Sequence, residues 1–173
     1  NVEGIAKELG GYGADKVIVC NHPELKVYTT DAYAKVLCDV AMDKKPEVIL
    51  LGATNIGRDL GPRCAARLRT GLTADCTHLD IDMDNYVEFL EKSSTLDLSN
   101  TKFDMEDVNL KQTRPAFGGH LMATIICPRF RPCMSTVRPG VMKKREKVEG
   151  ATGEIVNVKP AITEADIRTK IVE

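Results

Sequence analysis

The sequence predicts an α/β fold, a three-layer sandwich in which helices cover both faces of a mostly parallel sheet with mixed edge strands. Two observations support this class. In the first half of the chain, apolar runs at 16–20 and 48–51 alternate with helix-like segments, a pattern typical of parallel strands buried on both faces. In the second half, strand-like runs are bounded by Pro128, Pro132 and Pro139, which favours antiparallel or mixed pairing at an edge.

Each element follows from apolar spacing and from the residues that end it. The first half predicts a helix over 2–9, a strand over 16–20, a helix beginning at Thr30 or Asp31 and ended by Pro46, a strand over 48–51 and a helix over 56–68. The second half predicts strands over 72–82, 121–127, 134–137 and 154–158, and a helix start over 163–166. The acidic stretch 83–109 is expected to be a surface excursion with one amphipathic turn.

Composition limits the class of protein. The chain has 173 residues, of which 43% are apolar, 28% charged and 5% aromatic. This length predicts one compact domain, or one domain with a tail, and excludes a large multidomain enzyme. The apolar content excludes a disordered chain. We expect no membrane insertion, because no apolar stretch reaches the roughly 18 residues that a spanning helix needs.

The formal net charge of −1 hides two segments of opposite sign. Residues 75–107 carry ten acidic side chains and two lysines, whereas residues 111–147 carry nine basic side chains and one glutamate. One interpretation of this pattern is two solvated faces, which would neutralise each other if they were neighbours. We expect no nucleic-acid binding, because the basic segment lacks interleaved aromatic residues and a recognisable module.

The six cysteines are expected to be reduced thiols. None is paired at Cys-x-x-Cys spacing, so neither a zinc site nor a redox dithiol is predicted. The first residues lack the apolar core of a secretory signal, and a reducing cytoplasm is the expected location. Because the chain begins without methionine, inside a predicted helix, we expect it to be a fragment.

Two short segments could carry chemistry. The turn 52–57 joins a predicted strand to a helix, which suits either tight packing or an anion contact. It has no Walker A lysine and no dinucleotide glycine pattern. The segment 113–120 combines Arg114, Phe117, Gly118 and Gly119, which fits a ligand contact or equally a hairpin with a surface arginine.

Together these stretches resemble the first domain of the alpha subunit of an electron-transfer flavoprotein. The segment 113–119, with the acidic excursion before it, is similar to the clostridial group that uses flavin-based electron bifurcation. The resemblance covers nearly the whole chain and rests on residues 14–17, 28–30, 52–60, 62–63, 65–66, 70–77, 113–119 and 135–140.

The resemblance implies a Rossmann-like sheet of the adenine nucleotide alpha hydrolase type and a heterodimer with a beta subunit. It implies that electrons pass from NADH through FAD to an acyl-CoA dehydrogenase and ferredoxin. FAD is implied to be held largely by the beta subunit and by a second alpha domain. Residues 1–160 are expected to form an N-terminally truncated first domain, and 161–173 a linker or the start of that second domain.

The resemblance also implies a role for four residues, and no catalytic residue or metal ligand. Arg114 is implied to contact the flavin held by the beta subunit, and Phe117, Gly118 and Gly119 to shape the same wall. Two alternatives stay open: a nucleotide-binding α/β module, and a non-catalytic assembly scaffold of a simple electron shuttle. An incomplete phosphate motif argues against the first, and the second predicts that neutralising Arg114 leaves the flavin chemistry unchanged.

Overall fold

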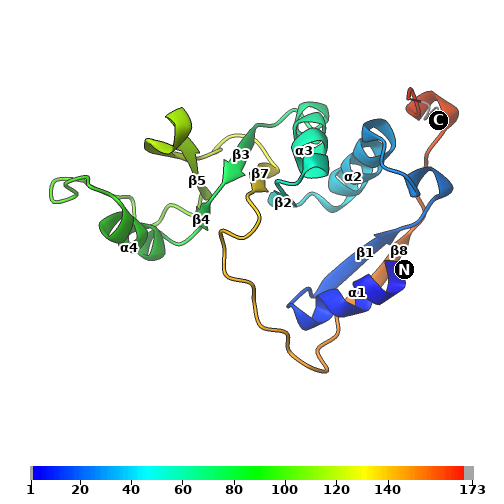
Figure 1. The fold of residues 1–173 in the computed structure, drawn as a ribbon, viewed down its shortest axis with the longest axis horizontal. Coiled ribbons are helices and arrows are strands. Elements are labelled where there is room, and N and C mark those ends of the chain that lie inside the picture. Colours follow the sequence, from blue (N-terminus) through cyan, green and yellow to red (C-terminus); the bar gives the residue numbers. More distant parts are fainter. Residues whose placement is uncertain (1, 170–173) are drawn as a thin grey trace. The chain divides into compact units, whose positions relative to one another are not determined.

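A computed structural model describes residues 2–169 of the chain (Figure 1). These residues form two compact units. The first unit combines the residues up to Asp43 with those from Lys143 onward, and the second runs from Lys44 to Met142. The chain therefore leaves the first unit, builds the second and returns to complete the first.

The first unit is built on a pair of parallel strands from opposite ends of the chain. β1 and β8 pair in register from Lys16 opposite Glu154 to Cys20 opposite Val158, and α1 packs along them (Figure 1). Ala6, from α1, is buried against β1. The elements of this unit are α1 (Val2–Gly11), β1 (Lys16–Cys20), η1 (Pro23–Leu25), α2 (Thr30–Lys44), β8 (Glu154–Val158) and η3 (Glu164–Asp166).

The second unit contains two three-stranded sheets. One is parallel, with the order β2-β7-β3, and the other is antiparallel, with the order β4-β5-β6. α3 packs on the parallel sheet. The elements of this unit are β2 (Val48–Gly52), α3 (Asn55–Arg67), β3 (Leu72–Cys76), β4 (His78–Asp80), α4 (Met83–Ser93), β5 (Lys111–Ala116), η2 (Phe117–Gly119), β6 (Leu121–Ile125) and β7 (Cys133–Val137).

The start of α3 is fixed by a cap and by close packing. The hydroxyl of Thr54 accepts a hydrogen bond from the Gly57 backbone N–H at 3.2 Å, which satisfies one of the free donors of the first turn. A Cβ atom added at Gly57 would lie 1.8 Å from the Gly52 carbonyl oxygen. Glycine is therefore required where the helix crosses the end of β2.

The predicted α/β class with mostly parallel strands is confirmed, but three details of the prediction are wrong. The later strands were expected to add an antiparallel or mixed edge. This holds for β6, which pairs antiparallel with β5, but β8 pairs in parallel with β1, and β7 lies between β2 and β3. The strand expected over 72–82 is two strands separated at Thr77. The stretch expected to hold one helical turn contains the whole of α4, because Asp82 caps its first turn by accepting from the Asn85 N–H.

No helix within residues 2–169 is long and apolar enough to cross a bilayer.

Candidate functional site

The four residues singled out in the sequence lie on one antiparallel hairpin. Arg114, in β5, stands opposite Ala123 in β6, and η2 makes the connection. Phe117, Gly118 and Gly119 all have positive φ, at 47°, 68° and 94°. Glycine adopts this backbone without steric cost, so the tight turn itself accounts for the adjacent glycines.

The side chain of Arg114 has a buried hydrogen-bond donor, its Nε–H group, from which no residue within 2–169 accepts a hydrogen bond. Its side chain is partly buried, and its Nε atom is shielded from solvent with no hydrogen-bond partner in the described part of the chain. A buried polar group in this condition costs about 1–3 kcal/mol. The site therefore offers a hydrogen bond to an acceptor supplied from outside these residues.

The surroundings of Arg114 are buried and polar. Burial raises the pKa of the Cys76 thiol, and the positive charge of Arg114 acts in the opposite direction. Thr77, the next residue, also has a buried hydroxyl without a partner among the described residues, while its backbone N–H donates to the Thr113 carbonyl at 2.9 Å. The two buried polar atoms without a described partner, Arg114 Nε and Thr77 Oγ1, thus belong to two segments that a backbone hydrogen bond joins.

The tip of the hairpin is open. The Phe117 side chain is 80% exposed, and a Cβ atom added at Gly119 would meet nothing within 4 Å. The structure therefore places the four residues on one hairpin, with a sheltered arginine and an exposed aromatic tip.

A second polar cluster, which sequence reasoning missed, lies at the carboxyl ends of the parallel strands. Asp75 Oδ1 accepts from Arg58 Nη2 at 2.6 Å, and Asp75 Oδ2 accepts from Arg138 Nη2 at 3.1 Å. The hydrogen bond from Arg138, together with that from Arg58, holds the pKa of Asp75 below its usual value. Two guanidinium groups share one carboxylate, so the cluster carries a net positive charge.

Cluster formation depends on the sheet order. Asp75 is near the end of β3, Arg138 follows β7, and Arg58 lies in the first turn of α3 after β2. Asp75 also has a positive φ of 67°, which is uncommon for a residue other than glycine. The sequence signal was incomplete: Arg58 and Arg138 come after predicted strands, and the carboxyl ends of parallel strands meet at one edge. Asp75, however, lies within the strand predicted over 72–82.

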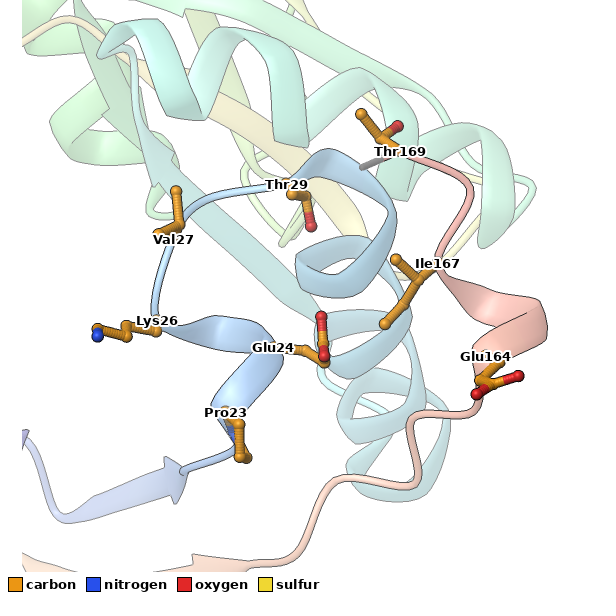
Figure 2. Close-up of a pocket in the computed structure, with 8 residues that line it drawn as sticks. All are labelled: Pro23, Glu24, Lys26, Val27, Thr29, Glu164, Ile167 and Thr169. Carbon is orange, nitrogen blue, oxygen red and sulfur yellow. The ribbon is translucent and has the colours of Figure 1, made fainter. Parts of the chain in front are cut away.

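The first unit contains an open cavity of about 760 Å³. It lies between the η1 region and the segment around η3 (Figure 2). Figure 2 shows Glu24, Thr29 and Ile167 facing this space. None of the residues implied to contact flavin lines this cavity.

Comparison with known proteins gives the family. The model of the electron transfer flavoprotein domain matches residues 1–163. The chain is 74% identical to the acryloyl-CoA reductase electron transfer subunit beta of Anaerotignum propionicum, over 99% of this chain and 47% of that protein. It is 52% identical to the electron transfer flavoprotein subunit alpha of Thermoanaerobacterium thermosaccharolyticum, over 99% of this chain and 45% of that protein.

A third relative is the lactate dehydrogenase (NAD(+),ferredoxin) subunit LctC of Acetobacterium woodii, which is 43% identical over 90% of this chain and 32% of that protein. The chain belongs to the electron transfer flavoprotein family. Its relatives that are named as electron transfer flavoprotein subunits alpha place it with the alpha subunits of that family, although the relative from Anaerotignum propionicum is named a subunit beta of its own complex. It spans less than half the length of these relatives.

Proposed function

We propose that this chain forms the first domain of an alpha subunit that passes electrons by flavin-based bifurcation. In this proposal electrons enter from NADH, pass through FAD and leave to an acyl-CoA dehydrogenase and to ferredoxin, in the cytoplasm. The domain comprises residues 1–160 and forms a base with the beta subunit. Residues 161–173 lead toward a second, FAD-binding domain.

The observation that supports this proposal is the buried, unpartnered Nε of Arg114. The isoalloxazine ring of FAD carries nitrogen and oxygen acceptors at its edge, so the donor present fits the group proposed. The exposed ring of Phe117 and the open backbone at Gly118 and Gly119 fit a flat ligand held by another subunit. We propose that these four residues face the flavin of the beta subunit.

Bound FAD supplies the hydride and single-electron chemistry. The part played by this chain is electrostatic. Arg114 is always protonated and is held in a partly buried strand, where a fixed charge acts more strongly than in water. It would donate a hydrogen bond and stabilise negative charge that develops next to it. Arg114 would thereby raise the potential at which electrons are accepted.

The test is a reductive titration of the full alpha–beta complex, followed by flavin absorbance, for the wild type, Arg114→Ala and Arg114→Lys. We expect Arg114→Ala to lower the potential of one flavin by about 30–60 mV, because 30 mV corresponds to about 1.4 kcal/mol in a two-electron couple. Arg114→Lys keeps the charge and should recover part of this shift. Arg67→Ala, an exposed arginine of α3 in the same unit, is the matched control.

Unchanged potentials in Arg114→Ala would remove Arg114 from the mechanism. They would favour the scaffold alternative, in which the domain serves assembly alone. One observation favours that alternative: β6, at the edge of its sheet, exposes Leu121 and Met122 at 57% and 54%. An exposed apolar edge strand suits subunit contact.

A further inference from the structure

Two cysteines of the second unit face one cavity. Cys127 follows β6, Cys133 begins β7, and both line a cavity of about 360 Å³ that also includes Arg131 and Glu47. Five residues separate them in the chain. Both are free thiols.

The segment between the two cysteines is folded back on itself. Arg131 Nη1 donates to the carbonyl oxygens of Cys127 at 2.8 Å and Phe130 at 3.0 Å. Arg131 Nε donates to Glu47 Oε2 at 2.7 Å, and the Cys133 N–H donates to the Glu47 carbonyl at 2.8 Å. Arg131 and Glu47 therefore tie both ends of the segment together and keep the two thiols in one cavity.

The two thiols interact but differ in their surroundings. Burial raises the pKa of Cys133, and the charge of Cys127 and a side-chain hydrogen bond with it raise that pKa further. Cys133 is only 4% exposed, and Gln112 Nε2 donates to its sulfur at 3.0 Å. Cys127 is partly exposed and donates weakly to the Phe130 carbonyl at 3.6 Å.

This arrangement matches a pair consisting of a reacting and a resolving thiol. An oxidant from solvent reaches the partly exposed sulfur of Cys127 more readily than the buried sulfur of Cys133, since susceptibility follows exposure. Cys133 lines the same cavity, where it accepts a hydrogen bond from Gln112, and it is placed to act as the resolving thiol.

We propose that Cys127 and Cys133 form a reversible intrachain disulfide on exposure to hydrogen peroxide. Cys127 loses its proton, its thiolate sulfur attacks one oxygen of the peroxide, the O–O bond breaks, and the hydroxide that leaves takes up the proton to form water. The sulfur of Cys133 then attacks the sulfenic sulfur of Cys127, an S–S bond forms, and water leaves with the Cys133 proton. Overall, two thiols and one hydrogen peroxide give one disulfide and two waters, and a dithiol reductant reverses the change.

The full-length protein in its complex is treated with hydrogen peroxide, alkylated and digested for mass spectrometry. We expect a peptide pair linked through Cys127 and Cys133, with dithiothreitol restoring both alkylated thiols. Cys20, which is also partly exposed but lies in the first unit, supplies the control, and Cys20→Ser should leave the linkage unchanged. In Cys133→Ser, Cys127 should accumulate as sulfenic acid that dimedone traps at least tenfold more than in the wild type.

Identification of the linked cysteines in the wild-type protein tests the proposed disulfide even if a variant fails to fold. Recovery of both cysteines as free thiols, or of Cys127 oxidised beyond sulfenic acid while Cys133 stays reduced, would overturn the proposal. Linkage of either cysteine to a different partner would overturn it as well.

Discussion

Gly57 offers a direct test of how α3 packs against the end of β2. A Cβ atom there would lie 1.8 Å from the Gly52 carbonyl oxygen and 3.0 Å from the Gly52 carbonyl carbon. Both atoms belong to the backbone, so no flexible side chain can move aside. To reach even 3.0 Å, the start of the helix must retreat by about 1.2 Å from β2.

The magnitude follows from two opposing effects. Overpacking of this kind costs about 1–3 kcal/mol and occasionally more, and a contact with backbone belongs at the upper end. Alanine in a helix gains about 1 kcal/mol over glycine. We therefore expect Gly57→Ala to lower the free energy of unfolding by about 2 kcal/mol, which corresponds to a decrease in Tm of about 4–8 °C.

Equilibrium urea unfolding of the intact protein measures this loss. Gly71→Ala is the matched control, because Gly71 is exposed and a Cβ there meets nothing within 4 Å. The control should change the free energy of unfolding by no more than about 0.5 kcal/mol. If Gly57→Ala proves as stable as Gly71→Ala, the close packing of α3 on β2 is refuted.

Two further substitutions probe buried or shared charges. Because the pKa of Asp75 is lowered in the folded state, its stabilising effect is present above its unfolded pKa of about 3.9 and is lost as the pH falls through the folded value. Asp75→Asn should therefore lower the free energy of unfolding by about 1 kcal/mol at pH 7. Between pH 5 and 3 the variant should lose less stability than the wild type, as measured by the midpoints of urea unfolding. Lys111→Met should lower the free energy of unfolding by about 2–3 kcal/mol, measured by thermal unfolding. The side chain of Lys111 is only 3% exposed, and its amine donates to the carbonyls of Ile81 and Asp107 at 3.2 and 2.5 Å; an unchanged Tm would contradict this.

Local elements were predictable because their signals are local. The helix of α3 follows a turn with a capping threonine at Thr54, and the strand of β1 is a continuous apolar run. The spacing of Tyr86 and Phe89 predicted one amphipathic turn, but the full length of α4 was missed. The stretch is acidic and only weakly periodic, and the capping residue Asp82 was not recognised as a helix start. The rings of Tyr86 and Phe89 lie 6.5 Å apart, with Phe89 stacked on His78 at 3.7 Å.

Features that depend on pairing between distant segments could not be predicted. The apolar run of β7 predicts a strand but not its place between β2 and β3. The ion pairs of Asp75 with Arg58 and Arg138 depend on that placement. The hairpin around Arg114 could be predicted, because strand and turn signals adjoin there. The hydrogen bond from the Thr77 N–H to the Thr113 carbonyl, which joins this hairpin to a distant segment, could not be predicted.

The most direct test of the proposed role is the nucleotide content of the purified full-length alpha–beta complex. Nucleotides are released by denaturation, separated and quantified against protein. A bifurcating complex with a flavin beside Arg114 predicts two FAD per alpha–beta pair. One FAD per pair would contradict the account and leave the domain as part of a simple electron shuttle.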